Sequence, residues 1–216
     1  MNGRATGGSP RGLCLAVLGP DGAGKSTVID RVTRHLGPRF AGVRRFHLRP
    51  HFGRDTSRGP VTDPHADRPR SAIASAMKLV LWWIDYRIGY ARWVRPALRR
   101  GELVVFDRYF WDLLADPRRY RYAGSSDLVR SVGRGIPRPD VTVVLDAPVE
   151  VLRSRKREVP REEVASQREI YRALAEELDG AVRVDASPPA DQVAEAVIRT
   201  LEGAALGDPI ANGGDR

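Results

Sequence analysis

The chain has almost no cysteine and no long hydrophobic run. Its 216 residues include one cysteine, Cys14, which lies in an apolar segment where we expect a small buried thiol rather than a nucleophile. No apolar run approaches the ~20 residues that a membrane-spanning helix needs. The first ten residues lack the hydrophobic segment of a signal peptide. We therefore expect a cytoplasmic protein with no membrane partner.

The chain is also poor in lysine, although it is strongly basic. Only 3 of the 36 basic residues are lysines, and the formal net charge is +9. An excess of arginine favours anionic partners, either nucleic acid or phosphorylated small molecules, but it also follows from GC-rich coding. Zinc-finger spacing, RNA-binding aromatic motifs and the Asn-Lys-x-Asp motif of GTPases are all missing from the sequence. The first two absences argue against a nucleic-acid partner, and the third argues against a GTPase switch.

One motif dominates the sequence, a glycine-rich loop that follows the apolar run at residues 13–18. The loop matches the pattern G-x-x-x-x-G-K-[ST], in which glycines let backbone N–H groups point inward around phosphate oxygens. Lys25 is predicted to reach the β- and γ-phosphates, while the Ser26 hydroxyl ligates Mg²⁺ at the start of the next helix. This motif predicts ATP and Mg²⁺ as cofactors. The predicted cofactor-binding residues of the loop are Gly19, Asp21, Gly22, Ala23, Gly24, Lys25, Ser26 and Thr27.

The order of apolar runs and amphipathic segments predicts an α/β protein. Strands are expected at residues 13–18, 43–48, 103–106, 141–145 and 181–184. Three of these runs are followed by an aspartate, and in an open parallel sheet ligands bind beyond the carboxyl ends of the strands. We therefore predict a three-layer α/β/α sandwich around a five-stranded parallel sheet. Residues 11–202 would form this single domain, between loose tails at residues 1–10 and 203–216.

Two unusual segments separate the second and third predicted strands. Residues 49–70 are rich in proline without periodicity and are either a loop that covers an acceptor or a disordered patch. Residues 71–100 are strongly helical, with a bend near Pro96 and an end at Gly101. We expect both apolar flanks of this helix to be core; alternatively, Trp82 or Tyr86 stacks on a flat acceptor, with Arg87 or Arg92 binding its anionic group. One flank comprises Ile73, Met77, Val80, Leu81, Ile84, Ile88 and Ala91, and the other comprises Trp82, Trp83, Tyr86, Tyr90 and Trp93.

Several short motifs accompany the phosphate loop: Arg95-Pro96-Ala97-Leu98 before Gly101-Glu102, Asp107-Arg108-Tyr109, Pro139-Asp140 and the arginine-rich segment after the fourth strand. Together with the loop, they give residues 13–202 a resemblance to the thymidylate kinase family. It implies a P-loop kinase fold with a short lid at residues 153–163. It also implies transfer of the ATP γ-phosphate to the 5′-phosphate of a deoxynucleoside monophosphate, dTMP in this family. Such kinases are commonly homodimers through the helix at residues 71–100.

The resemblance also implies roles for single residues. Asp107 would help to hold magnesium, Arg108 would bind phosphate at the transfer point, and Asp21 would face the sugar of the acceptor. Arg153 and Arg157 are four residues apart, so on a helix they would share a face and grip the transferring phosphoryl group, unless they form only a solvated basic helix end. The predicted catalytic residues are Lys25, Asp107, Arg108, Arg153 and Arg157. Ser187, in the loop after the fifth strand, would lie against the adenine base.

The acceptor half departs from the family pattern. The segment before Pro50 has Arg49 but lacks the glutamate of the family's Arg-Glu-Pro, and Asp85 is followed by Tyr86 with the arginine displaced to Arg87. The cluster at residues 118–122 alternates cations with aromatic rings and is either an acceptor site or a solvated basic loop. The predicted substrate-binding residues are Asp21, Arg49, Tyr86, Arg87 and Arg108. Three functions stay open: a dTMP kinase, a kinase of another nucleotide, nucleoside or sugar phosphate, and a non-catalytic nucleotide-binding module.

Overall fold

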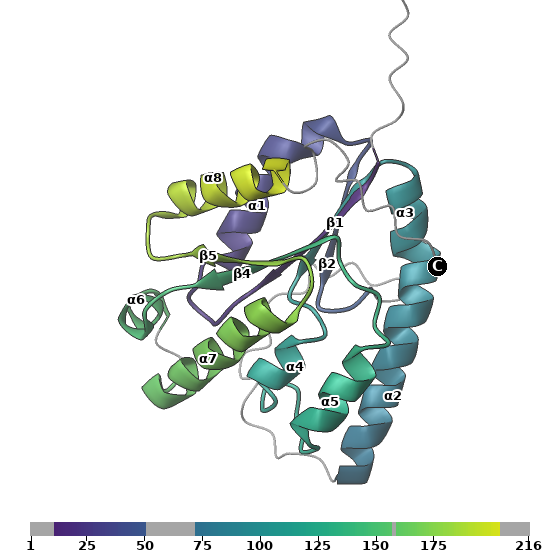
Figure 1. Cartoon of the computed structure of the whole chain (residues 1–216), viewed down its shortest axis with the longest axis vertical. Helices are drawn as coiled ribbons and strands as arrows, with labels where there is room; N and C mark the ends of the chain where they lie inside the picture. The colour runs from purple at the N-terminus through teal and green to yellow at the C-terminus, as the bar shows by residue number, and fades with distance from the viewer. Residues whose placement is uncertain (1–10, 51–71, 157–158, 204–216) are drawn as a thin grey trace, which may run out of the picture.

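A five-stranded parallel sheet forms the centre of the protein (Figure 1). The computed structural model describes residues 11–50, 72–156 and 159–203. The strand order is β2-β3-β1-β4-β5, and all four pairings are parallel, which confirms the predicted sheet. The strands are β1 (Leu13–Leu18), β2 (Val43–His47), β3 (Leu103–Asp107), β4 (Val141–Asp146) and β5 (Ala181–Asp185).

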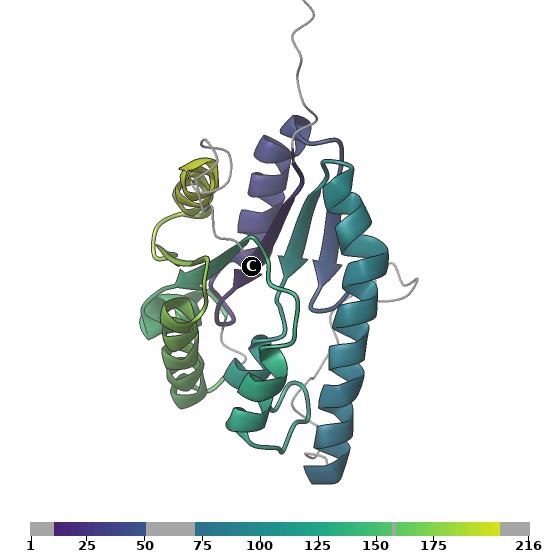
Figure 2. The same ribbon diagram turned by 45° about the vertical axis from the view of Figure 1, so that its right-hand side comes forward.

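Helices cover both faces of the sheet, as the apolar character of β1 requires. Alternate residues of this strand enter two separate cores: Leu15 and Val17 pack in the core that includes α1 (Lys25–Leu36) and α8 (Ala190–Leu201). Ala16 and Leu18 pack in the other core, under α2 (Ala72–Gly89), α4 (Asp112–Ala115), α5 (Ser126–Gly133) and α7 (Arg161–Glu177). Figure 2 shows the sheet between these two helical layers, which confirms the three-layer prediction.

The long helix between β2 and β3 changes its geometry before its proline. A π turn (Tyr90–Val94) separates α2 from α3 (Arg95–Arg99), and Pro96 lies in the first turn of α3. Proline has no N–H to continue the helical hydrogen-bond ladder, which explains why the ladder rearranges just ahead of it. The segment ends at Gly101, whose φ of 77° is the left-handed conformation predicted for this position.

The prediction that both flanks of the long helix are core is wrong for the aliphatic flank, and also for Trp83 of the aromatic flank, which is 38% exposed. Trp82 and Tyr86 are buried, whereas the whole aliphatic flank is exposed in the single chain, up to 76% for Ile73. Periodicity identifies apolar stripes but cannot choose between two of them, because only one side of a helix can face the core. The exposed flank comprises Ile73, Met77, Val80, Leu81, Ile84, Ile88 and Ala91.

The predicted lid at residues 153–163 includes the end of one helix and the start of the next. Residues 153–155 form the last turn of α6 (Val149–Arg155), and α7 begins at Arg161. Residues 1–10 and 204–216 of the predicted tails, nearly all of the proline-rich segment and the lid residue Arg157 lie outside the described ranges. A 3₁₀ turn (Gly37–Arg39) ends α1. Among the helices described, none is long and apolar enough to cross a lipid bilayer.

Candidate active site

The phosphate loop lies between the carboxyl end of β1 and the first turn of α1. Gly22 and Gly24 have φ angles of 86° and 81°, which side chains with a Cβ rarely adopt. Gly22 also lies so close to α6 that an added Cβ would be 2.4 Å from the backbone oxygen of Leu152. Ser26 and Thr27 are exposed at the start of α1, where their hydroxyls can reach a ligand. The loop therefore has the geometry of an anion cradle.

Lys25 lies folded over this loop. Its side chain is buried, and its Nζ donates hydrogen bonds to the backbone oxygens of Gly19 (2.7 Å) and Pro20 (2.9 Å). Burial, followed by the nearby cation of Arg108, lowers the pKa of Lys25 to about 7. Without an anion, this ammonium group is consequently easy to deprotonate.

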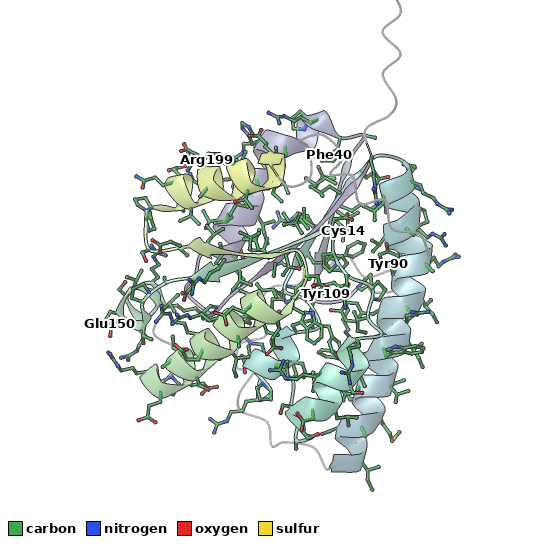
Figure 3. The ribbon with its side chains drawn as sticks, viewed as in Figure 1. Cys14, Phe40, Tyr90, Tyr109, Glu150 and Arg199 are labelled. Atoms are coloured by element: carbon green, nitrogen blue, oxygen red, sulfur yellow. The ribbon has the colours of Figure 1, made fainter. Side chains whose placement is uncertain are left out.

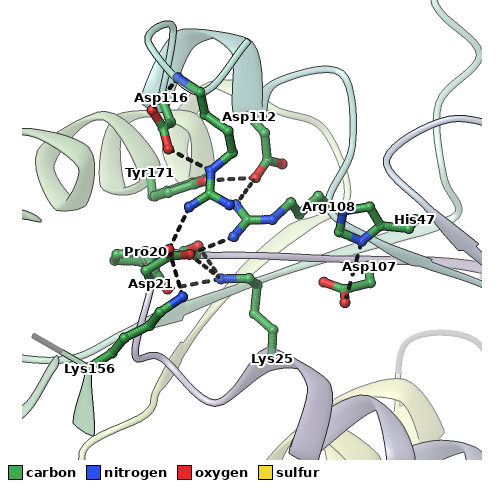
Figure 4. Close-up of polar contacts among 12 residues, drawn as sticks. Pro20, Asp21, Lys25, His47, Asp107, Arg108, Asp112, Asp116, Lys156 and Tyr171 are labelled. Atoms are coloured by element: carbon green, nitrogen blue, oxygen red, sulfur yellow. Dashed lines mark hydrogen bonds and ion pairs between the residues drawn. The ribbon is translucent and has the colours of Figure 1, made fainter. Parts of the chain in front are cut away.

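Asp21 is the meeting point of four cations (Figure 4). Its Oδ1 accepts from Arg108 (2.5 Å) and lies 4.0 Å from the Nζ of Lys25. Its Oδ2 accepts from Arg119 (2.5 Å) and Lys156 (3.3 Å). Burial alone would raise the pKa of Asp21, but these four cations together hold it well below its usual value. The cations come from three segments that are distant in sequence, so the fold concentrates positive charge beside the phosphate loop.

A second, fully buried carboxylate holds Arg108 in place. Asp112 accepts from Arg108 (3.0 Å) and from the Tyr171 hydroxyl (2.7 Å) through Oδ1, and from the Tyr109 backbone N–H (2.9 Å) through Oδ2. Arg108 itself has a φ of 73°, an unusual value for a non-glycine residue. This strained conformation aims the guanidinium at Asp21, and the Asp112 contacts maintain it.

Asp107 ends β3 next to β1, in register with Val17. Its side chain is partly exposed, with one oxygen 3.7 Å from Nδ1 of His47. Burial would raise the pKa of Asp107, but His47, followed by Lys25 and Arg108, lowers it, so the carboxylate is ionised at neutral pH. Within the described ranges, no group of three or more His, Cys, Asp or Glu side chains could hold a metal by itself. A Mg²⁺ ion held by a nucleotide's phosphates, by water and by one or two protein oxygens fits this environment.

Among the described residues of the predicted lid, Lys156 reaches the phosphate loop. Arg153 is half-buried, and its Nε has no hydrogen-bond partner among the residues described. Arg155 instead donates to three consecutive backbone oxygens in the loop after β5, at Ala186 (2.7 Å), Ser187 (2.9 Å) and Pro188 (3.1 Å). Thus α6 is tied to both the phosphate loop and the Ser187 loop.

Two of the predicted substrate-binding residues lie elsewhere. Tyr86 is only 1% exposed, and its hydroxyl donates to the backbone oxygen of Leu48 inside the core. Arg87 is on the exposed side of α2, stacked over the Trp83 ring. The structure thus places Tyr86 in the core and Arg87 on the outer side of α2, and brings neither to the phosphate loop.

A second group of cations and aromatic rings surrounds Trp82. The Arg49 guanidinium lies 4.7 Å and the Lys78 ammonium 5.3 Å from the centre of its ring, and Tyr120 packs edge-on against it at 5.4 Å. Arg49 also binds Asp85 (2.5 Å). The Nε of Arg49 and the hydroxyl of Tyr120 are buried without a hydrogen-bond partner in the part of the chain that is described. Such atoms are costly unless a ligand or water satisfies them.

Several residues of the site were missed from the sequence. Arg119 was only one member of a basic cluster, and Asp112 and Asp116 had no assigned role, although Asp112 lies four residues after Arg108. Asp116 fixes Arg119 by accepting from its Nε (2.8 Å) and its backbone N–H (3.0 Å). Tyr171 lies on α7, far along the chain, and carries no sequence signal for its contact with Asp112.

Comparisons with known proteins agree on one family. The family model described as thymidylate kinase matches residues 17–197. A probable thymidylate kinase of Pyrobaculum calidifontis is 33% identical, covering 88% of this chain and 96% of that protein. The thymidylate kinase of Lactobacillus helveticus is 27% identical, covering 89% and 96%. The fold is similar to the crystal structure of thymidylate kinase from Ehrlichia chaffeensis, with a TM-score of 0.62 at 15% identity, covering 89% of this chain and all of that one.

Proposed function

The chain belongs to the thymidylate kinase family, and on that premise we propose that it transfers the γ-phosphoryl group of ATP to the 5′-phosphate of dTMP, giving dTDP and ADP. One observation carries the proposal: Lys25, Arg108, Arg119 and Lys156 all converge on Asp21 in the phosphate loop. Phosphoryl transfer needs little covalent help from the protein, because catalysis consists mainly of positioning and of stabilising the charge on the phosphoryl oxygens.

In this mechanism, the loop from Gly19 to Thr27 binds the triphosphate of ATP through its backbone N–H groups. Lys25 exchanges its contacts with the backbone oxygens of Gly19 and Pro20 for the β- and γ-phosphates. The loop at Ser187, held by Arg155, lies beside the adenine base. Ser26 and Asp107 would hold Mg²⁺, which neutralises charge on the phosphates when it is bound.

The acceptor phosphate binds to Arg108 in this proposal. Asp112 and Tyr171 hold the guanidinium from behind, so its orientation is set before the acceptor arrives. Arg119 and Lys156 add charge from the opposite side of Asp21, together with Arg153 and Arg157 of the lid when it closes. Asp21 contacts the sugar, and these cations keep it ionised.

For the acceptor base, we propose the space beside Trp82 instead of Tyr86 and Arg87. Arg49 and Tyr120 supply the polar groups there, since each has a buried atom without a partner in the described residues. Trp82 is buried, so in this proposal a nucleobase stacks on its ring in the place that the Arg49 guanidinium takes in this structure.

The experiment that tests this function is ADP release from ATP and Mg²⁺ with dTMP, other nucleoside monophosphates, nucleosides and sugar phosphates as acceptors. We expect turnover with dTMP and a loss of about 10²-fold to 10³-fold in Arg108→Ala, by analogy with removal of one charge-stabilising donor. Arg199→Ala is the matched control, because Arg199 is exposed on α8. Turnover only with another acceptor would reassign the substrate, and none with any acceptor would favour a nucleotide-binding module.

We also propose that two chains associate through the exposed flank of α2. Ile73, Met77 and Leu81 are each more than half exposed, and they continue into Ile84 and Ile88 along one side of the helix. A contiguous apolar surface of this kind is unusual on a monomer and typical of an interface. The molar mass in solution tests the proposal.

A further inference from the structure

A second cavity lies on the α5 and α7 side of the sheet, away from the phosphate loop. Its volume is about 340 Å³, and it is bounded by the end of α5, the connection to β4 and the end of α7. The side chain of Tyr109, labelled in Figure 3, forms part of its inner wall. This volume is within the range of small-molecule sites.

The inner wall of the cavity is aromatic and apolar. Trp111, Ile136 and Pro137 line it together with Tyr109, whose hydroxyl donates to the backbone oxygen of Pro137. Gly133 is required here, because a Cβ at this position would lie 2.3 Å from the Trp111 ring. The edge of the ring therefore packs directly against α5, and the indole contributes an aromatic side chain to the wall of the cavity.

The rim of the cavity has one more cation than it has carboxylates to pair with. Arg130 pairs with Glu177, and Arg138 pairs with Asp179. Arg134, the third arginine of the rim, is exposed and forms no ion pair with any residue that the structure describes. An anionic group on a ligand would complete the charge balance at Arg134.

We propose that this cavity is a second ligand site, which binds a small planar aromatic acid through the Trp111 wall and the Arg134 guanidinium. The inference goes beyond the proposed kinase function and does not depend on it. The cavity is distinct from the nucleotide site, because Arg108 points to Asp21 whereas its neighbour Tyr109 points to Pro137.

The test uses 2-naphthoate as the probe and titration calorimetry on the full chain. A ligand of this size in a preformed pocket is expected to bind with a Kd of about 1 mM or below. Arg134→Ala should weaken binding by about tenfold, because it removes a charge-assisted hydrogen bond, while Arg134→Lys should retain most of the affinity. The neutral analogue 2-naphthamide should bind as weakly to the wild type as 2-naphthoate binds to Arg134→Ala.

Two controls place the probe in this cavity. Arg199→Ala should bind 2-naphthoate as the wild type does, since Arg199 is an exposed arginine on α8. Saturation with ADP and dTMP should leave the affinity unchanged, because these ligands would occupy the phosphate-loop site. Three results would each overturn the proposal. The first is no binding at about 10 mM probe, which is ten times the expected Kd. The second is equal affinity in the wild type and in Arg134→Ala, and the third is displacement of the probe by the nucleotides.

Discussion

Binding of Mg·ATP should take up a proton at Lys25. With a pKa of about 7 in the free protein, Lys25 is mostly neutral at pH 8, and the fraction that is neutral there is about 0.9. A bound triphosphate stabilises the charged form and raises the pKa toward its ordinary value of 10.5. We therefore expect uptake of about 0.9 proton per site at pH 8, and the Kd for ATP should rise by up to about tenfold per pH unit above pH 7.

The assay is calorimetry of Mg·ATP binding without acceptor, in two buffers that differ in ionisation enthalpy. The difference between the observed enthalpies gives the number of protons taken up. Lys25→Arg is the matched control: the guanidinium remains charged, so its proton uptake at pH 8 should be close to zero. Uptake at pH 8 that is the same in the wild type and in Lys25→Arg would refute the reasoning, because the titrating group could not then be Lys25.

Four further predictions follow from named contacts. Asp112→Asn should destabilise the fold by about 2–4 kcal/mol, because it leaves the buried Arg108 with one carboxylate fewer, and thermal unfolding measures this loss. Tyr171→Phe removes one donor to Asp112, so we expect a higher KM for dTMP with an unchanged KM for ATP; equal changes in both would contradict this assignment. Arg155→Ala should raise the KM for ATP, since it releases the loop at Ser187, and an unaltered value would exclude that role. Leu81→Arg should halve the molar mass measured by light scattering, whereas a wild type that is itself monomeric would contradict the proposed interface.

The phosphate loop shows that a contiguous motif can predict local backbone structure from the sequence alone. Its glycines, Lys25 and Ser26 lie in consecutive positions, so the backbone conformation that the motif needs is encoded locally. The strands were equally accessible, because a parallel sheet covered on both faces requires continuous apolar runs such as the one in β1. The position of Asp107 was predicted by the same reasoning, because the carboxyl ends of the parallel strands lie together at one edge of the sheet.

The long helix shows a feature that periodicity cannot predict, namely which of its two flanks is buried. Its two apolar flanks have the same periodicity, and only packing against the rings of Tyr109 and Phe110 decided that Trp82 and Tyr86 are core while Leu81 is exposed. The choice is a tertiary one, because it depends on the shape of the surface against which the helix packs. For the same reason, the sequence could not predict that the Tyr86 ring is buried.

The sequence by itself determined the donor chemistry and the strands of this protein, because the phosphate loop and the apolar runs are local patterns. Only the tertiary structure decided which charges surround the site. Asp21 meets Arg119 across 98 positions and Lys156 across 135, and Asp112 meets Tyr171 across 59. No local pattern specifies such distant pairs. They form when the packing of α4, α6 and α7 brings these side chains together beside the phosphate loop, where burial makes each unpaired charge costly.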